Sequence, residues 1–320
     1  MNLLILCAGF ILLFAGGETL VRGAVSLARH FGISPLIIGV TIVGFGTSAP
    51  ELAVVIDAQL LGRPGITAGN VIGSNLANLM LILGAAALVR PVRITPDAIR
   101  RDGIALAVTT VVFVAMGLGG AVHVWHGVAM MAALAAYIGW SLRRDTVSTG
   151  TSVAELHRRE ADELRQPPPD QPWLMAVLII AGIAALVWGG NLVVAGASAL
   201  ARAAGISDGV IGLTIIAFGT SLPELAVSIV AALRNRFEVC VGNVIGSNIF
   251  NLFGVTGVAT MIAPVPFTGQ TAEFGLWALL AVTFGMLAAM LTGRIVSRIE
   301  GGLVLLLYCG YFVFQFLPTP

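Results

Sequence analysis

Long apolar runs alternate with short polar segments along the whole chain. A helix needs about 20 apolar residues to cross the hydrocarbon core of a bilayer, and ten of the runs approach this length. They predict ten membrane-spanning helices, at residues 3–28, 34–61, 66–89, 103–119, 122–142, 173–202, 207–233, 239–262, 272–293 and 297–317. The polar stretch at 143–172 separates the first five helices from the last five, and we expect a solvated linker there.

The sequence repeats itself at a spacing of 173 residues. GISPLIIGVTIVGFGTSAPELAVVI at 32–56 aligns with GISDGVIGLTIIAFGTSLPELAVSI at 205–229. GNVIGSNLANL at 69–79 aligns with GNVIGSNIFNL at 242–252. Internal repeats of this size in a membrane protein indicate a transporter fold.

An odd number of helices in each repeat has a topological consequence. After five helices the chain lies on the opposite side of the membrane, so the second repeat must insert upside down. We therefore predict an all-α integral membrane protein with a first five-helix repeat at 1–142 and an inverted repeat at 173–320. The second and seventh helices, 34–61 and 207–233, each contain a proline and are predicted to be discontinuous.

The arginines give an independent test of the topology. If the N-terminus lies outside, the cytoplasmic loops hold fourteen arginines, and the outer loops hold only Arg63 and Arg202. Cytoplasmic loops of membrane proteins carry such an excess of basic residues. We expect both termini outside and a location in the plasma membrane, which is the inner membrane in a bacterium.

Composition supports the membrane class and argues against several functions. The chain is 58% hydrophobic and 10% charged, against roughly 25% charged residues in a soluble domain. A net charge of +1 gives no electrostatic signal for nucleic acid. The sequence contains no lysine, so a Gly-Lys-Ser phosphate loop is excluded and ATP is not an expected partner. The three cysteines are widely spaced and are expected to be apolar packing residues: Cys7, Cys240 and Cys309.

The motif GFGTSAPEL places an acid in the middle of an apolar run. Thr47, Ser48 and Glu51 share one helix face, and the second copy, AFGTSLPEL, repeats them as Thr220, Ser221 and Glu224. A serine followed by a glutamate three residues later also fits a helix-capping box. Capping alone does not explain a carboxylate near the bilayer centre, which costs about 3 kcal/mol or more. Two copies on inverted repeats favour a shared cation site.

The proline of each copy disturbs the helix around it. Proline has no N–H, and its ring displaces the carbonyl four residues earlier. Backbone oxygens are therefore freed near Phe45 and Gly46, and near Phe218 and Gly219. In the membrane such oxygens are tolerated only where protein, water or an ion satisfies them.

The second motif, GNVIGSN, adds further oxygen ligands. Ser74 and Asn78 lie four residues apart on one helix face, as do Ser247 and Asn251. Asn70 and Asn243 lie one turn earlier on a similar face, whereas Asn75 and Asn248 fit helix–helix hydrogen bonding equally well. The glycine pairs Gly69/Gly73 and Gly242/Gly246 predict close helix contacts.

Together these groups form a site made only of oxygen. Hard cations such as Ca²⁺ and Na⁺ prefer oxygen ligands, whereas Zn²⁺ and Cu⁺ prefer nitrogen or sulfur. The two glutamates match the charge of one Ca²⁺, and the same oxygens suit Na⁺. No HExxH motif is present and no serine–histidine arrangement lies near the two motifs, so we expect no enzyme.

The paired GTSxPEL and GNVIGSNxxN segments resemble the alpha repeats of the sodium/calcium exchanger family, most densely over residues 32–88 and 205–261. The resemblance implies a ten-helix inverted-repeat fold with a cluster of four ion sites, and a sliding gate made by the first and sixth helices. The ligands it implies are Thr47, Ser48, Glu51, Ser74, Asn78, Thr220, Ser221, Glu224, Ser247 and Asn251.

The chain departs from many members of that family at one ligand. They carry aspartate at the Asn251 position, and asparagine here argues against dependence on potassium. The motif of proton/calcium exchangers is absent, so the resemblance favours sodium as counter-ion. The linker at 143–172 has no room for the calcium-sensing domains of animal exchangers, so a minimal prokaryotic form is expected.

The sequence therefore predicts a secondary antiporter that exchanges Ca²⁺ for Na⁺ by alternating access. It is expected to need no cofactor, to bind no nucleic acid and to act as a monomer in the bilayer. H⁺/Ca²⁺ exchange, or exchange of another divalent cation, remains an alternative; a membrane enzyme or a passive channel is disfavoured. Two further intramembrane acids, Glu18 and Asp57, lack an acidic mate in the other repeat, and their roles stay open.

Overall fold

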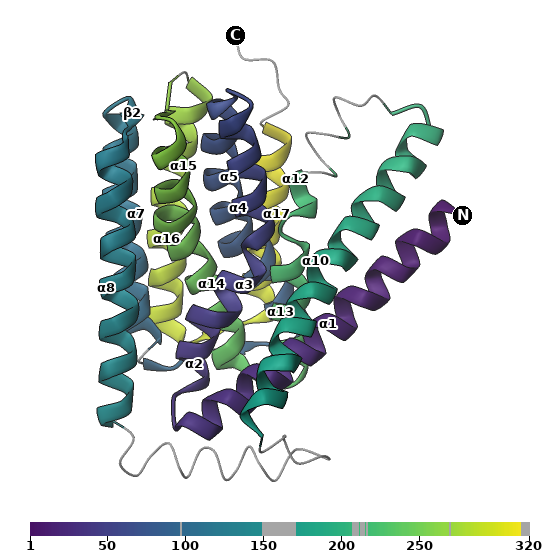
Figure 1. Cartoon of the computed structure of the whole chain (residues 1–320), viewed down its shortest axis with the longest axis vertical. Coiled ribbons are helices and arrows are strands. Elements are labelled where there is room, and N and C mark those ends of the chain that lie inside the picture. The colour runs from purple at the N-terminus through teal and green to yellow at the C-terminus, as the bar shows by residue number, and fades with distance from the viewer. Residues whose placement is uncertain are drawn as a thin grey trace.

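The computed structural model describes residues 1–96, 98–148, 171–206, 211, 215, 217–268 and 270–314. These residues form a bundle of helices with two very short antiparallel strand pairs (Figure 1). Two long helices, α1 (Asn2–Phe31) and α10 (Pro172–Ala203), lie side by side and slant across one side of the bundle. Among the described residues, seven helical segments are long and apolar enough to cross a membrane, and one further candidate is a helix pair bent by 43°.

The first half of the chain continues from α1 through short helical pieces, where η denotes a π-helical turn. In order these are α2 (Pro35–Ile38), η1 (Gly39–Val43), α3 (Gly44–Thr47), α4 (Ala49–Leu60), α5 (Pro64–Leu76), η2 (Ala77–Ile82), α6 (Leu83–Val89), β1 (Val92–Arg93), η3 (Ala98–Gly103), α7 (Ile104–Leu118), β2 (Ala121–Val122) and α8 (Val124–Ser148).

The second half continues from α10 in a similar order. Its described elements are α12 (Ala217–Gly219), α13 (Leu222–Leu233), α14 (Phe237–Ile249), η5 (Phe250–Val255), α15 (Thr256–Ile262), β3 (Val265–Pro266), α16 (Gln270–Gly293), β4 (Ile295–Val296) and α17 (Arg298–Phe314). The series α5–η2–α6 and α14–η5–α15 begin, change and end at positions 173 residues apart. The sequence repeat is therefore also a structural repeat.

Each predicted span overlaps helical segments of the described chain, although α17, with 17 residues, is not among the segments long and apolar enough to cross a membrane. The span predicted at 34–61 is the bent pair, Pro35–Thr47 and Ala49–Leu60, and is discontinuous as expected. Part of the span predicted at 207–233 lies outside the described residues, and α13 is its described end. The predicted linker at 143–172 is also largely outside them, but α8 continues to Ser148, six residues beyond the predicted end at 142. Within that helix the guanidinium of Arg144 stacks over the ring of Trp140, 5.4 Å from the ring centre.

Glycines at seven-residue intervals bring α1 and α10 together. A Cβ atom on Gly16 would lie 2.9 Å from the backbone nitrogen of Leu186, and one on Gly189 would lie 2.8 Å from that of Leu13. Such distances leave room only for hydrogen, so the two backbones pack directly against each other. The sequence carries this signal in both helices, as Gly9, Gly16 and Gly23 and as Gly182, Gly189 and Gly196.

The prediction of an all-α fold missed four two-residue strands. β1 pairs with β4 and β2 pairs with β3, so each pair joins a loop of the first half to a loop of the second. Hydrogen bonds from Ile94 N to Arg294 O (2.8 Å) and from Phe267 N to Gly120 O (2.9 Å) extend the pairs. Strands of two residues are too short to leave an alternating pattern in the sequence.

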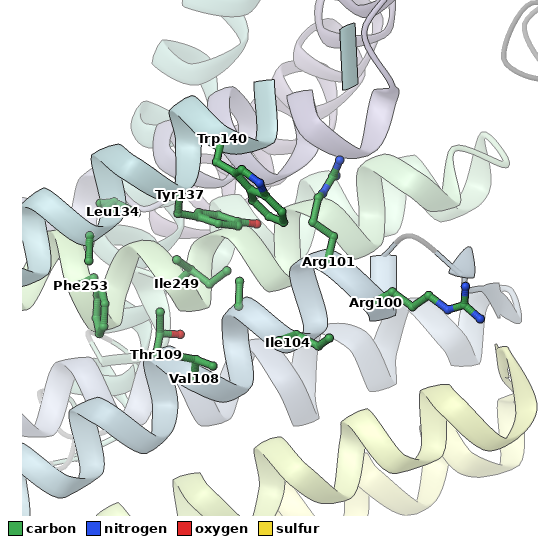
Figure 2. A pocket seen from close by; sticks show the side chains of 12 residues that line it. Arg100, Arg101, Ile104, Val108, Thr109, Leu134, Tyr137, Trp140, Ile249 and Phe253 are labelled. Carbon is green, nitrogen blue, oxygen red and sulfur yellow. The ribbon is translucent and has the colours of Figure 1, made fainter. Parts of the chain in front are cut away.

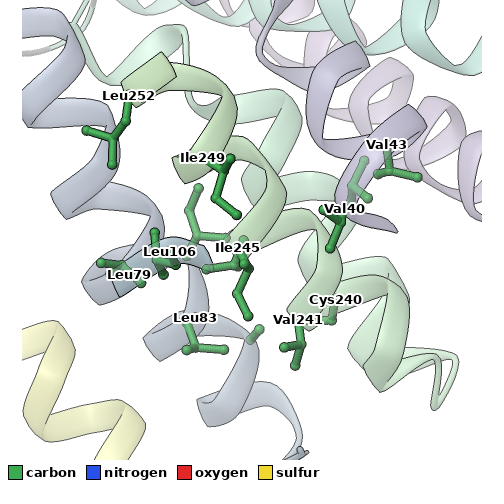
Figure 3. Packing of buried hydrophobic residues seen from close by; sticks show 14 of the residues in the cluster. Val40, Val43, Leu79, Leu83, Leu106, Cys240, Val241, Ile245, Ile249 and Leu252 are labelled. Atoms are coloured by element: carbon green, nitrogen blue, oxygen red, sulfur yellow. The ribbon is translucent and has the colours of Figure 1, made fainter. Parts of the chain in front are cut away.

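The core of the bundle is built around α14. Figure 3 shows Ile245 and Ile249 of α14 between two groups, Val40 and Val43 of η1 on one side and residues of η2, α6 and α7 on the other. Cys240 is fully buried in this cluster, as predicted for an apolar packing residue. Cys7 and Cys309 differ from that prediction because they are exposed on α1 and α17.

Candidate functional site

The first GTSxPEL motif lies at the bend between α3 and α4. α3 ends at Thr47 and α4 begins at Ala49, and Ser48 between them has φ −82° and ψ 11°. Pro50 occupies the first turn of α4, where a helix needs no N–H donor. The same missing N–H removes the donor that would bond to the carbonyl of Gly46 in a regular helix, so the freed oxygen stays a prediction.

The second copy forms an equivalent break between α12 and α13. Ser221 precedes α13 with φ −88° and ψ 4°, close to the values of Ser48. The carbonyl of Phe218 accepts a hydrogen bond from Ser221 N at 3.2 Å. Of the two predicted backbone oxygens in this half, Gly219 O is therefore the one that Pro223 leaves without its usual helical donor. Thr220 lies in this break and is half-buried.

The two breaks face each other and exchange hydrogen bonds between hydroxyls and carboxylates. Ser48 Oγ donates to Glu224 Oε1 at 2.9 Å, and Ser221 Oγ donates to Glu51 Oε1 at 3.3 Å. Each carboxylate thus accepts a bond from the serine of the other half. Neither serine caps its own helix with its side chain, so the capping-box interpretation is wrong for both copies.

Both carboxylates are deeply buried, and each has an oxygen to spare. Glu51 and Glu224 are each 1% exposed. Within the described part of the chain, the Oε2 atom of each glutamate has no hydrogen-bond partner, and no arginine or histidine forms an ion pair with either carboxylate. Burying an anion without a compensating charge is costly. The arrangement therefore suits a cation held between the two glutamates.

Thr47 and Ser247 meet beside this pair. The hydroxyl of Thr47 lies 3.4 Å from that of Ser247, and both reach the carbonyl oxygen of Gly44, at 3.3 and 3.2 Å. A Cβ atom on Gly44 would lie 2.9 Å from the backbone nitrogen of Ser247, so only glycine allows this approach of η1 and α3 to α14. Two hydroxyls from different halves of the chain are thereby held together.

The predicted asparagines lie on π-helical turns. Asn78 belongs to η2 and Asn251 to η5, and both side chains are 1% exposed. Among the described residues, neither the amide oxygen nor the amide nitrogen of either asparagine has a hydrogen-bond partner. π-Helical turns are frequent at functional sites because they displace a side chain from the regular helical register. Ser74, on α5, is buried next to η2.

Two other asparagines of the GNVIGSN motif bond within their own helices. Asn75 Nδ2 donates to Val71 O, and Asn248 Nδ2 donates to Val244 O, both at 2.6 Å. The prediction of close contact at Gly242 is confirmed, because a Cβ atom there would lie 2.6 Å from Leu36 O. Gly69 and Gly73 would contact the segment of the second half that is equivalent to Leu36 and its neighbours. That segment lies mostly outside the described residues, so close contact at these two glycines stays a prediction.

The acids without an acidic mate lie away from the crossed pair. Glu18 of α1 forms ion pairs with Arg22 in its own helix (2.8 Å) and with Arg234 at the end of α13 (2.9 Å). Asp57 is exposed on α4, two turns beyond Glu51. Sequence reasoning found neither the ion pair between α1 and α13 nor the environment of Asp57, because both depend on how α1 and α10 pack.

A cavity of about 410 Å³ lies elsewhere, between α7, α8 and α14 (Figure 2). Its wall is mainly apolar, and none of the predicted ligands lines it. At one end Asp102 accepts hydrogen bonds from Arg101, at 2.7 and 2.9 Å, and from the hydroxyl of Tyr137, at 2.7 Å. This acid is thus already neutralised, in contrast to the two glutamates.

Sequence reasoning placed Asn243 on the face of the predicted ligands but missed its partners and Ser228. Asn243 Nδ2 donates to Ser228 Oγ at 3.0 Å and to the carbonyl oxygen of Glu224 at 3.2 Å, while Asn243 Oδ1 accepts from Thr47 at 3.1 Å. The sequence carried one signal for this pair. Ser228 is a polar residue at a position where the first repeat has the apolar Val55.

Comparison with known proteins bears on the whole chain. The profile of the sodium/calcium exchanger protein family matches residues 1–143 and 174–317. The putative antiporter CaxA of Alkalimonas amylolytica is 37% identical over 313 residues, which cover 95% of each chain. The sodium/calcium exchanger MaX1 of Methanosarcina acetivorans is 30% identical, and the alignment covers 98% of each chain.

A solved structure has the same fold. The sodium-calcium exchanger NCX_Mj, soaked with zero Na⁺ and Ca²⁺, superposes with a TM-score of 0.84 at 30% identity and 98% coverage of both chains. The family profile, the relatives and this structure all match nearly the full length of the chain. The chain is a multi-pass membrane protein of the sodium/calcium exchanger family.

Proposed function

We propose that the protein is a secondary antiporter that exchanges Ca²⁺ for Na⁺ across the membrane. The observation that carries the proposal is the crossed pair of serine–glutamate hydrogen bonds, Ser48 to Glu224 and Ser221 to Glu51. Two buried carboxylates from equivalent motifs lie together without a basic partner in the described chain. The relatives named as sodium/calcium exchangers support the same pair of ions.

The cation ligands in this proposal are the predicted set. They are the side chains of Thr47, Ser48, Glu51, Ser74, Asn78, Thr220, Ser221, Glu224, Ser247 and Asn251, with backbone oxygens near Phe45, Gly46, Phe218 and Gly219. Their donors are carboxylate, hydroxyl, amide and carbonyl oxygens, which suit hard cations. Among the described residues no group of three or more histidine, cysteine or acidic side chains is placed to hold a metal, which fits an ion shared with hydroxyls and amides.

Exchange follows from the competition of the two ions for these oxygens. Two carboxylates balance the charge of one Ca²⁺, and they are too costly to bury ionised without any cation. A cycle in which Ca²⁺ leaves only when Na⁺ replaces it couples the two fluxes. In this cycle Ca²⁺ and Na⁺ are substrates, and we propose no cofactor, no ATP, no nucleic acid and no enzymatic reaction.

For the architecture we propose ten membrane-spanning helices in two inverted repeats, at 1–142 and 173–320, joined by the linker at 143–172. Both strand pairs join one half to the other, which supports repeats related by a two-fold axis. The arginine bias supports a plasma-membrane protein with both termini outside. We propose that it acts as a monomer, because the crossed pair is built within one chain.

For the mechanism we propose alternating access, in which α1 and α10 slide together across the other helices. The glycine contacts between α1 and α10 support their movement as one unit. α1 covers the face of α13 at Gly17, whereas the equivalent face of α4, with Asp57, is exposed. An ionised Asp57 facing lipid costs about 3 kcal/mol, so we expect water on this face.

The proposal is tested by flux into proteoliposomes that contain the purified protein. An outward Na⁺ gradient, at equal pH inside and outside, is expected to drive uptake of ⁴⁵Ca²⁺. A pH gradient without Na⁺ is the matched control and is expected to drive little uptake. Uptake driven by the pH gradient alone would favour H⁺/Ca²⁺ exchange, and Ca²⁺ conductance without any gradient of Na⁺ or H⁺ would indicate a channel.

A further inference from the structure

Asn243 and Ser228 lie behind the proposed ligands and outside the predicted set. Both side chains are 0% exposed, and they come from α14 and α13. A buried polar group that loses its partner costs about 1–3 kcal/mol. The hydrogen bonds of these two side chains are therefore costly to break, and their partners indicate the role of each side chain.

The amide of Asn243 has one allowed orientation. Its nitrogen donates to the carbonyl oxygen of Glu224 at 3.2 Å and to Ser228 Oγ at 3.0 Å, so both N–H bonds are used. A flipped amide would turn its oxygen toward the carbonyl oxygen of Glu224, and two acceptors would then face each other. The amide oxygen is therefore directed at Thr47, whose hydroxyl lies 3.1 Å away.

This orientation gives the proton of the Thr47 hydroxyl an acceptor. A hydroxyl has one proton and two lone pairs, and only the lone pairs attract a cation. Asn243 Oδ1, at 3.1 Å, lies nearer than Gly44 O at 3.3 Å and Ser247 Oγ at 3.4 Å, and the Glu224 carboxylate is the other acceptor within reach. A cation bound to that carboxylate repels the hydroxyl proton and leaves Asn243 as its acceptor. With the proton held by Asn243, the lone pairs of Thr47 are left for a cation near Ser247 and the carboxylates.

The first repeat lacks this arrangement. Val55 occupies the position equivalent to Ser228, and valine offers no acceptor for an amide. Asn70 is equivalent to Asn243, and its Oδ1 has no hydrogen-bond partner in the described chain, in contrast to Asn243 Oδ1. Asn243 therefore supports Thr47 by a hydrogen bond that Asn70 does not provide to Thr220.

We propose that Asn243, fixed by Ser228, is a positioning residue that orients the Thr47 hydroxyl toward the transported cation. The equivalent pair of the first repeat, Asn70 and Val55, has no such role. This inference rests on the proposed function, because it assigns a role at the same cation site. Mutation of a residue that hydrogen-bonds a metal ligand typically lowers metal affinity or activity by about 10 to 100-fold. An effect on cation affinity is therefore expected from Ser228, although its hydrogen bonds within the described chain reach Asn243 and Cys240 and no predicted ligand side chain.

The test compares Ser228→Ala with two matched variants in Na⁺-driven ⁴⁵Ca²⁺ uptake. Ser228→Ala is expected to raise the KM for Ca²⁺ about 10-fold, with a much smaller change in kcat. Ser228→Thr keeps the hydroxyl and is expected to restore a KM near that of the wild type. Val55→Ala changes the equivalent position of the first repeat and is expected to leave KM unchanged. A normal KM in Ser228→Ala, or an equal rise in Val55→Ala, would overturn the inference.

A second background separates positioning from general destabilisation. In a Thr47→Val protein the hydroxyl is already gone, so Ser228→Ala is expected to have little further effect on the Ca²⁺ affinity measured by calorimetry. An undiminished loss of affinity in that background would show that Ser228 does not act through Thr47. A wild-type protein without Na⁺-driven uptake would refute the proposed function instead, so the two failures are distinguishable.

Discussion

Equivalent faces of α4 and α13 are covered differently. On α13, Ala226 and Val230 are 7% and 4% exposed, and a Cβ atom on Gly17 of α1 would touch Val230 at 3.3 Å. On α4, the equivalent residues Ala53 and Asp57 are exposed. The two halves carry the same motifs and bury their glutamates equally, yet among the described residues a long helix covers this face on α13 and not on α4.

The difference indicates which side of the proposed site is open. Gly190 of α10 is equivalent to Gly17, but a Cβ atom on it would meet Gly219 O at 3.7 Å and would not meet α4. In Figure 1, α4 runs toward the upper end of the bundle and α13 toward the lower end. On the proposed mechanism the structure is open along α4, which lies outside in the predicted topology. Closing that side would bring α10 over Asp57.

The largest expected effect is the loss of either carboxylate. Glu51→Gln and Glu224→Gln should each lower Ca²⁺ flux by at least about 100-fold. Mutation of a residue that only hydrogen-bonds a metal ligand already lowers affinity or activity by about 10 to 100-fold, and these glutamates are proposed as ligands themselves. The difference in packing between the halves should not matter here, since both glutamates are 1% exposed. Asp57→Asn is the matched control and should retain flux. Normal flux in either glutamine variant would remove that residue from the site.

A smaller effect is expected from the two serines, and it should differ between them. Ser48 bonds Glu224 at 2.9 Å, whereas Ser221 bonds Glu51 at 3.3 Å. Hydrogen bonds to charged groups contribute about 1.5–3 kcal/mol, and longer bonds contribute less. Ser48→Ala should therefore weaken Ca²⁺ affinity more than Ser221→Ala in calorimetric titrations. The reverse order would mean that the crossed bonds are not the main contribution of these serines.

The smallest effect concerns the ion pair that joins α1 to α13. The side chains of Glu18 and Arg234 are 26% and 57% exposed, and such pairs contribute about 0–1 kcal/mol. The equivalent positions, Asn191 and Leu61, have no such pair, so it favours only the state in which α1 covers α13. Glu18→Gln should shift the proposed equilibrium toward the other state by about fivefold at most.

That shift is measurable at Ala53, which is exposed here and which α10 would cover in the other state of the proposed mechanism. Ala53→Cys, in a background without the native cysteines, should react with an impermeant maleimide added outside. Glu18→Gln should slow this labelling, and Arg234→Gln should slow it equally. Faster labelling, or an effect of one variant alone, would show that the ion pair does not hold α1 in place.

Much of the fold could be predicted because its signals are local. The breaks at Pro50 and Pro223 follow from the missing N–H of proline, and the repeat spacing predicted equivalent helices. The strand pairs at Val92 and Ala121 could not be predicted, because they depend on contacts between the two halves. The positions of α1 and α10 against α13 and α4 depend equally on tertiary packing.

The proposed site shows the same division. The sequence pointed to Glu51 and Glu224 because an acid in an apolar run is costly and needs a reason. It did not predict that each glutamate bonds the serine of the other half, since spacing within one helix carries no information about its partner. It also missed Asn243 as the partner of Thr47, because that contact spans 196 residues of sequence.

The central claim is that one cation site is built jointly by the two halves of the chain. Calorimetric titration of the purified protein with Ca²⁺, with and without Na⁺, tests it most directly. We expect the wild type to bind Ca²⁺ that Na⁺ displaces, and we expect this binding to be lost in Glu51→Gln and in Glu224→Gln separately. Retained Ca²⁺ binding of wild-type affinity in either single variant would contradict it.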